Sequence, residues 1–268
     1  GLANGGRIRH GVVLELAVPR SWLATFQVVE YLRAFLVGRL GWNRLGGNLI
    51  VSGAFGLFRR STVVAVGGYA LDTVGEDMEL VARLRRCAPP WLQPRAVVHL
   101  PDPVAFTEAP ESWHILGNQR DRWQRGLADT LWRYRDLIGR RRHGALGMAV
   151  LPFYVMFELA GPVIELFGYG YCAVLWAAGH LDITFALVFL GLALGIGWLL
   201  SASALVFERM LLGFYRRPGD LARLLLAAVL ENCGFRQMVL YFRLRGLWKY
   251  VRGNKSWGRM VRAGFRAG

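Results

Sequence analysis

Residues 183–207 contain no charged side chain and are almost entirely apolar. A helix needs roughly 20 consecutive apolar residues to cross the hydrocarbon core of a bilayer, and this stretch meets that length. The sequence therefore predicts a transmembrane helix here. Hydrophobic residues make up 54% of the chain, which is high for a soluble domain and fits a membrane protein.

A second apolar region, residues 146–181, precedes this stretch. It is interrupted by Glu158 and Glu165 and broken at Gly161 and Pro162. Intramembrane carboxylates are costly and usually face protein or water rather than lipid. The sequence leaves open whether the two glutamates pair with buried arginines or serve a function.

The chain carries a formal net charge of +15. Basic clusters at residues 140–143 and 216–217 flank the two apolar regions, and the positive-inside rule places both clusters on the cytoplasmic side, with two crossings between them. Anionic lipid accounts for such charge, whereas a nucleic-acid partner is argued against by the apolar runs and by the lack of a recognition motif. We therefore expect a multi-pass protein of the cell (inner) membrane with its front half in the cytoplasm.

Residues 221–242 are apolar but contain Glu231, Asn232 and Arg236. A crossing here would place the basic tail outside, against the positive-inside rule, so an interfacial or re-entrant helix is favoured. The expected domains are therefore residues 1–142 (cytoplasmic), 143–215 (transmembrane helices) and 216–268 (an interfacial or membrane-associated basic helical tail).

The front half of the chain is predicted to contain both short strands and helices. Residues 12–18 are rich in β-formers and end at Pro19. Ser21 is positioned to cap a helix that stops near Gly38 or Gly41. Further short elements are expected at residues 49–51 (strand), 61–66 (helical turn) and 96–100 (strand). The three cysteines lack metal-ligand spacing and are expected to be free thiols.

A helix is expected to begin directly after Gly75, with Glu76 and Asp77 in its first turn. Acidic residues at this end suit the helix dipole, which is a purely structural reason for their presence. The alternative is that one of the two carboxylates is a general base, which requires it to face a cleft.

A longer helix is expected from near Pro110, and it carries Gln119, Arg122 and Trp123 at i, i+3 and i+4. These three side chains share one helix face. An indole offers a flat platform for a sugar ring, and a guanidinium matches the geometry of phosphate. Ordinary packing of Trp123 and solvation of Arg122 are the structural alternatives.

Residues 52–56 read Ser-Gly-Ala-Phe-Gly and follow the short apolar strand. Glycines around small residues let a backbone approach a ligand closely, so Gly53, Ala54 and Phe55 are candidate binding residues. A simple tight turn is the alternative.

These pieces occur in a fixed order: residues 52–56, Gly68-Tyr69, Glu76-Asp77, then Gln119 to Trp123, and finally the membrane helices. This order resembles the processive inverting family 2 glycosyltransferases, the group of cellulose, hyaluronan and poly-N-acetylglucosamine synthases. The resemblance covers nearly the whole chain and rests on the combination, since each motif alone is weak.

The resemblance implies a fold and a set of roles. The fold class would be α/β, a partial GT-A (Rossmann-like) domain followed by transmembrane α-helices. Asp77 would be the base that deprotonates the acceptor hydroxyl, and Trp123 would stack under the acceptor sugar. Gln119 and Arg122 complete the second motif, with Arg122 at the nucleotide diphosphate, and Glu76 belongs to the binding site. The substrates would be a nucleotide sugar and a polysaccharide acceptor.

The sequence departs from the family pattern in two places. Gly75 stands where cellulose synthases carry Thr, and no D-x-D motif occurs. That motif holds Mg²⁺ or Mn²⁺ in the family, so the metal ligands of the full enzyme are expected outside this chain. The chain is thus expected to be the C-terminal portion of such an enzyme. A non-catalytic membrane scaffold or channel subunit is the alternative, and a partner subunit is possible in either case.

Overall fold

The computed structural model describes residues 6–9, 12–51, 53, 55–87, 97–101, 107–254 and 256. Strands β1 (Gly6–Arg9) and β2 (Val12–Leu16) form an antiparallel pair in which Gly6 lies opposite Leu16. The helical elements follow in this order: α1 (Trp22–Tyr31), η1 (Leu32–Arg39), α2 (Leu40–Arg44), α3 (Arg60–Ala65), α4 (Glu76–Cys87), α5 (Trp113–Arg133), η3 (Arg135–Leu137), η4 (Arg141–His143), η5 (Leu146–Val150), α6 (Leu151–Phe153), η6 (Tyr154–Leu159), α7 (Gly161–Ala177), α8 (Ile183–Leu211), α9 (Pro218–Leu230) and α10 (Phe235–Val251).

The described part of the chain is therefore mostly helical. The strand expected near residues 12–18 is confirmed as β2, but residues 49–51 and 97–100 form no strand. Leu49 is instead fully buried among helices. A Rossmann-like sheet does not appear within the described residues, so the α/β class stays a prediction.

The first helix begins where its capping residue predicts and runs further than expected. The Ser21 hydroxyl accepts a hydrogen bond from the backbone N–H of Ala24. Beyond Tyr31 the helix continues as the π-helix η1 and then as α2 to Arg44, so the predicted end near Gly38 or Gly41 is wrong. A helical glycine costs only about 1 kcal/mol, which surrounding packing can offset.

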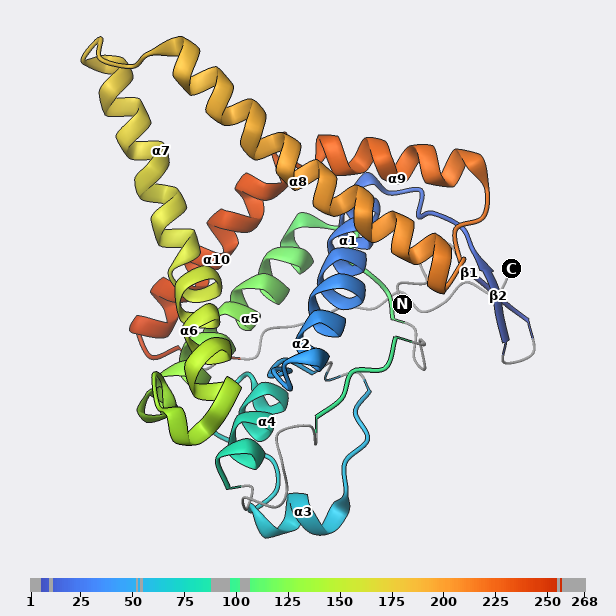
Figure 1. Cartoon of the computed structure of the whole chain (residues 1–268), viewed down its shortest axis with the longest axis vertical. Coiled ribbons are helices and arrows are strands. Elements are labelled where there is room, and N and C mark those ends of the chain that lie inside the picture. The colour runs from blue at the N-terminus through green and yellow to red at the C-terminus, as the bar shows by residue number, and fades with distance from the viewer. Residues whose placement is uncertain are drawn as a thin grey trace.

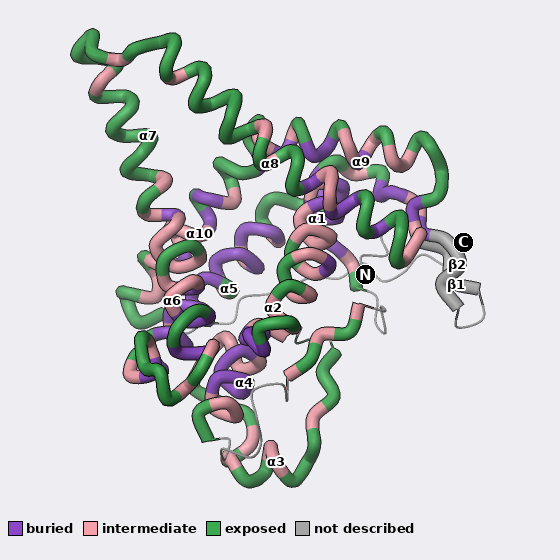
Figure 2. The backbone as a smooth tube through the Cα atoms, viewed as in Figure 1, coloured by how far each residue is buried: buried purple, intermediate pink, exposed green. Residues whose placement is uncertain are grey.

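Helix α5 lies at the centre of the fold, with α1, α4 and α10 around it (Figure 1). It begins at Trp113, with Ser112 as its cap, and not near Pro110. The carbonyl of Pro110 accepts a hydrogen bond of 2.8 Å from the Gln27 amide of α1, so this residue is engaged in a contact between segments instead. Most of α5 is buried (Figure 2).

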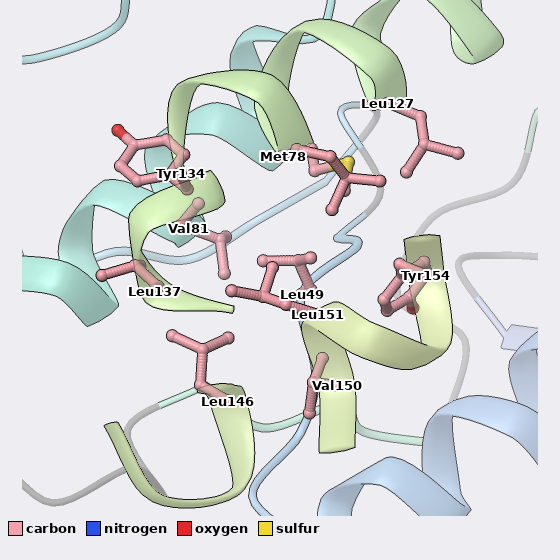
Figure 3. Packing of buried hydrophobic residues seen from close by; sticks show 12 residues of the cluster. Leu49, Met78, Val81, Leu127, Tyr134, Leu137, Leu146, Val150, Leu151 and Tyr154 are labelled. Carbon is pink, nitrogen blue, oxygen red and sulfur yellow. The ribbon is translucent and has the colours of Figure 1, made fainter. Parts of the chain in front are cut away.

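One apolar cluster joins α4 and α5 to η5, α6 and η6 (Figure 3). Val81 of α4, Leu131 of α5 and Leu151 of α6 are almost wholly buried in it. Each such side chain contributes about 1.5–3 kcal/mol by leaving water. The cluster therefore fixes α4 against α5, which is the arrangement on which the candidate site depends.

Helix α10 packs on the other side of α5 through two glycines. A Cβ on Gly117 would lie 2.8 Å from the Phe242 ring, and one on Gly246 would lie 2.7 Å from the Asp121 carbonyl oxygen. The Asp121 carboxylate, 1% exposed, accepts hydrogen bonds from Arg125 (2.7 Å), Arg245 (3.0 Å) and Lys249 (2.7 Å). Burial alone would raise the pKa of Asp121, but the hydrogen bonds from Lys249 and Arg125, with the charges of these two residues, outweigh burial and lower it.

Helices α7 and α8 project from the rest of the molecule as a hairpin whose surface is largely exposed (Figures 1 and 2). Within the described residues, α8 is the one helix long and apolar enough to span a membrane. A second span is added if residues 146–159 and α7, bent by 41°, count as one. The predicted helix at residues 183–207 is thus confirmed, as is the break near Gly161.

The two glutamates of this region have protein partners. Glu158 accepts a hydrogen bond of 2.9 Å from Arg243, and Glu165 accepts one of 3.0 Å from the Tyr169 hydroxyl. For Glu158 this is the pairing with arginine that the sequence left open. The three cysteines are free, as expected.

Residues 221–242 do not form a single helix. Helix α9 ends at Leu230, and α10 begins after Gly234, whose φ of 102° is a left-handed conformation that favours glycine. Glu231, in the turn between them, points inward and binds Arg33 at 2.6 Å. The polar residues that interrupt the apolar run form this turn, and the interfacial or re-entrant placement of the region stays a prediction.

Candidate active site

Asp77 lies in the first turn of α4 and is partly exposed. One carboxylate oxygen, Oδ1, accepts a hydrogen bond of 2.8 Å from the backbone N–H of Met78. The other, Oδ2, lies beside Gly53, where an added Cβ would come within 3.0 Å of it. Gly53 thus lies close to the predicted base, whereas the sequence suggests only that this segment approaches a ligand. Phe55 is exposed, and Ala54 lies outside the described residues.

Two glycines set the start of α4 directly against α5. A Cβ on Gly75 would lie 2.7 Å from the Cα of Gly126, and one on Gly126 would lie 2.8 Å from the Cα of Gly75. Gly126 follows Arg122 and Trp123 by four and three residues, so all three share one face of α5. The contact brings the Asp77 turn to this face. It also explains why threonine is absent at position 75, because its side chain would collide with α5.

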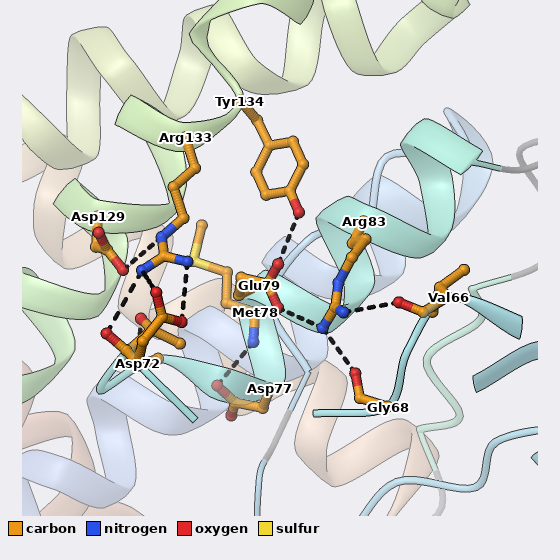
Figure 4. Close-up of polar contacts among 12 residues, drawn as sticks. Val66, Gly68, Asp72, Asp77, Met78, Glu79, Arg83, Asp129, Arg133 and Tyr134 are labelled. Atoms are coloured by element: carbon orange, nitrogen blue, oxygen red, sulfur yellow. Dashed lines mark hydrogen bonds and ion pairs between the residues drawn. The ribbon is translucent and has the colours of Figure 1, made fainter. Parts of the chain in front are cut away.

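Hydrogen bonds hold α4 and the segment before it in place (Figure 4). The buried Glu79 accepts hydrogen bonds from the Tyr134 hydroxyl of α5 at 2.7 Å and from Arg83 at 2.8 Å. Arg83 also donates to the carbonyl oxygens of Val66 and Gly68. These contacts fix the turn that carries Gly68-Tyr69 to the helix that carries Asp77.

A second set of hydrogen bonds joins the segment before α4 to α5. Arg133 of α5 donates hydrogen bonds to both carboxylate oxygens of Asp72, at 2.9 and 3.1 Å, and to Asp129 at 2.9 Å. Asp72 precedes the Gly75 contact by three residues. The approach of the chain to Asp77 is therefore anchored on α5 at both Asp72 and Gly75.

Trp123 offers a partly open aromatic surface. Its side chain is 42% exposed. The Arg120 guanidinium carbon lies 4.5 Å from the centre of its ring, and the Tyr31 ring of α1 lies 6.3 Å away. Gln119 is buried, and its Oε1 accepts no hydrogen bond from any described residue. Arg122 is partly buried on the same helix.

Side chains of α1 and η1 complete this region, although no sequence motif assigned them to the candidate site. The Tyr31 ring lies 5.2 Å from Phe35, over which the Arg39 guanidinium sits at 3.8 Å. Burial lowers the pKa of Arg39 to about 10, and the charge of Asp77 acts in the opposite direction, so Arg39 and Asp77 feel each other's field. The signal that could have revealed them is the presence of Glu30, Arg33 and Arg39 in a predominantly apolar helix.

His99 lies next to Phe35, at the end of the group formed by Tyr31, Phe35 and Arg39. Its ring lies 6.1 Å from Phe35 and its backbone exchanges hydrogen bonds with the Asn43 side chain. Burial, together with the charge of Arg39, lowers the pKa of His99 to about 4, so the imidazole is neutral at neutral pH.

Glu76 is the first residue of α4 and is partly buried. The described residues contain no group of three or more histidine, cysteine or acidic side chains that could hold a metal ion. The described residues around Asp77 therefore form no metal site by themselves. The site instead offers a partly exposed carboxylate, an open indole and a guanidinium, which can take up a proton, stack on a ring and hold an anion.

A family model described as glycosyl transferase family group 2 matches residues 8–207. The chain belongs to this family. The match spans Gly53, Asp77 and Trp123 as well as most of α8, whereas α9 and α10 lie outside it. No curated protein matches the chain, and no solved structure does so. Membership of glycosyl transferase family group 2 indicates that this is a glycosyltransferase domain, acting on a nucleotide sugar and an acceptor.

Proposed function

We propose that the chain is the acceptor-side and membrane part of an inverting glycosyltransferase that extends a β-linked polysaccharide. The observation that carries this proposal is the seating of the Asp77 turn on α5, through Gly75 and Gly126, beside the face that holds Trp123. A base and a sugar platform then lie on neighbouring elements, as transfer to a carbohydrate hydroxyl requires.

The proposed reaction uses Asp77 as the base. The Asp77 carboxylate takes the proton from an acceptor hydroxyl, whose oxygen attacks the anomeric carbon of the donor from the face opposite the diphosphate. The bond between that carbon and the diphosphate oxygen breaks, so the configuration inverts and the nucleoside diphosphate leaves. General base catalysis of this kind contributes about 10²–10⁴-fold to a rate.

The remaining residues bind and orient in this proposal. The exposed part of Trp123 stacks against the terminal acceptor sugar, with Gln119 nearby on the same helix face. Arg122 stabilises the charge that develops on the departing diphosphate. Gly53, Ala54, Phe55 and Glu76 line the acceptor side. Mg²⁺ or Mn²⁺ would be held by D-x-D acids that this chain does not contain, so no step is assigned to the metal.

The membrane setting is part of the proposal. Helix α8, and the bent pair of residues 146–159 with α7, would cross the cell membrane, with the basic residues 140–143 and 216–217 and the catalytic part in the cytoplasm. Helices α9 and α10 would lie with the cytoplasmic part, since α10 packs on α5. A partner subunit could then join at the membrane helices.

A second candidate is a non-catalytic scaffold or channel subunit. It is favoured by the lack of a D-x-D motif in the chain and by the lack of a metal-binding cluster among the described residues. A scaffold would keep the membrane helices and the packing of α5 while making no use of Asp77.

Sugar transfer in native membranes tests the proposal. Membranes from cells that make the protein are incubated with a panel of radiolabelled nucleotide sugars, and the polymer is digested with β-specific and α-specific glycoside hydrolases. We expect a β-linked product whose yield falls sharply in Trp123→Ala but is retained in Trp132→Ala, which removes an exposed indole elsewhere on α5. Equal product from both variants would favour the scaffold.

A further inference from the structure

Arg120 is a buried cation placed against the back of the proposed sugar platform. It is 5% exposed, and its guanidinium carbon lies 4.5 Å from the centre of the Trp123 ring and 5.9 Å from that of Tyr31. A guanidinium over an aromatic face is held there by the ring quadrupole. Arg120 therefore fills one side of Trp123 while the indole stays partly open elsewhere.

Glu30 of α1 holds this cation in position. Its Oε2 accepts a hydrogen bond of 2.7 Å from Arg120. A buried guanidinium needs a counter-charge, and loss of one partner of such a pair leaves an uncompensated charge. Glu30 is thus the group that lets Arg120 remain against Trp123.

The neighbouring cations do not compete for Glu30. Arg33, one turn further along the chain, binds Glu231 at 2.6 Å, and Arg243 binds Glu158 at 2.9 Å. Each of these arginines therefore has its own carboxylate. The Glu30 charge is left for Arg120.

A cavity of about 280 Å³ lies beside Glu30 and is also lined by Arg33, Glu165 and Glu231. Arg120 itself does not line this cavity. If Glu30 is neutralised, the Arg120 guanidinium loses its counter-charge, and the ion pair between α1 and α5 no longer holds it against Trp123.

We propose that Glu30 is a positioning residue for the acceptor: through Arg120 it sets the orientation of Trp123 under the terminal sugar. This inference rests on the proposed function and adds to it a residue from a separate segment of the chain. Glu30 itself touches neither substrate nor reacting atoms.

Steady-state kinetics on the native membrane protein tests the inference, with separate titration of an oligosaccharide acceptor and of the nucleotide sugar. In Glu30→Gln we expect the KM for the acceptor to rise about tenfold, with the KM for the donor changed by less than about twofold, because only the acceptor platform is disturbed. Glu30→Asp should restore part of the loss. The matched control is Glu165→Gln, which lines the same cavity and binds Tyr169.

A double-mutant cycle asks whether Glu30 acts through Trp123. In a Trp123→Ala background, Glu30→Gln should cost no more than about twofold further, since coupled residues are non-additive. Full additivity would overturn the inference.

A second readout does not depend on activity. The protein is labelled with 5-fluorotryptophan, and the Trp123 resonance is assigned from Trp123→Phe. We expect Glu30→Gln to shift this ¹⁹F resonance and Glu165→Gln to leave it unchanged. An unmoved resonance in Glu30→Gln overturns the inference. Unchanged transfer in both Asp77→Asn and Trp123→Ala would instead overturn the proposed function, and the inference with it.

Discussion

Asp77 can serve as a base only if its carboxylate is held while remaining open to a hydroxyl. The backbone N–H of Met78 fixes one oxygen, and Gly53 leaves room beside the other. A glycine is the one residue that brings no side chain to this point. The space at Gly53 is thus as much a part of the site as the carboxylate.

At the residue scale we therefore predict that Gly53→Ala impairs transfer without unfolding the protein. The added methyl group would lie 3.0 Å from Asp77 Oδ2, so the carboxylate would have to give way by a few tenths of an ångström. Because a misplacement of about 1 Å can cost about 10²-fold in rate, this smaller shift should lower transfer by roughly threefold to tenfold. The measurement is the initial rate of sugar incorporation, with thermal unfolding recorded in parallel. Gly41→Ala, where a Cβ meets open space, is the control, and equal rates in both variants would contradict the prediction.

Residue types and their spacing pointed to only some of the residues of the candidate site. Trp123 and Asp77 stand in motifs whose chemistry can be read from their types and spacing. Arg39 and Glu30 are missed because their importance comes from where α1 and η1 pack, which is a long-range contact. The Gly75 departure, likewise, makes sense only once Gly126 is known to lie against it.

At the scale of elements, α5 organises the fold because α4 packs on one part of its surface and α10 on another. The contact with α4 is made at backbone distance, through Gly75 and Gly126. The contact with α10 is made through Gly246 and the buried Asp121. Each contact yields its own prediction.

Gly126→Ala should destabilise the protein, although alanine is the better helix former. The added methyl group would overlap the backbone of Gly75, and overpacking costs about 1–3 kcal/mol, partly offset by a helix-propensity gain of about 1 kcal/mol. A net loss of up to about 2 kcal/mol lowers the Tm by up to about 8 °C for a chain of this size. Thermal unfolding in detergent measures it. A Tm at or above wild type would be contrary to the expected close packing, and Gly168→Ala on the open face of α7 is the matched control.

The attachment of α10 to α5 should weaken in acid. The pKa of Asp121 is lower in the folded state than its unfolded value of about 3.9. A lowered folded-state pKa stabilises the protein above the unfolded value, and that stabilisation is lost as pH falls through the folded value. Limited proteolysis at the α10 end should therefore accelerate below about pH 4. Asp121→Asn should be cleaved faster at neutral pH and respond less to acid, whereas an equally steep response in both proteins would refute the prediction.

Some elements were predicted correctly from the sequence and others were not, and the difference has physical reasons. Helix α8 and the N-terminus of α4 follow from apolar length and from local signals, and the structure has both. The end of the first helix was misplaced because Gly38 and Gly41 are tolerated within a packed helix. The turn at Glu231 was missed because its ion pair with Arg33 joins distant segments.

At the scale of the whole molecule, α7 and the N-terminal part of α8 project from a helical body that carries the candidate site, and the C-terminal part of α8 packs on that body, where Leu205 is buried (Figure 1). The exposed surface of the hairpin is apolar, with Phe167, Trp176 and Phe189 among its large side chains. An apolar surface of this kind is better accommodated by lipid than by water. The apolar runs predicted this separation, whereas the way α9 and α10 fold back depends on contacts that no local pattern encodes.

We predict that His180, in the turn between α7 and α8, lies on the opposite side of the membrane from Arg141. Single cysteines are introduced as His180→Cys and Arg141→Cys in a protein whose three natural cysteines are replaced by serine. A membrane-impermeant maleimide added to intact cells should label position 180 only, and position 141 should react only after lysis. Labelling of both positions in intact cells would show that the hairpin does not cross.

The central claim is that Asp77 is the base of a sugar transfer, and the rate of transfer by Asp77→Asn tests it most directly. Asparagine keeps the size of the side chain but cannot take up the proton. With membranes of equal protein content, the account predicts a fall of about 10²-fold or more in sugar incorporation. Asp136→Asn, at an exposed ion pair with Arg86, should transfer at the wild-type rate. Wild-type transfer by Asp77→Asn would contradict the account.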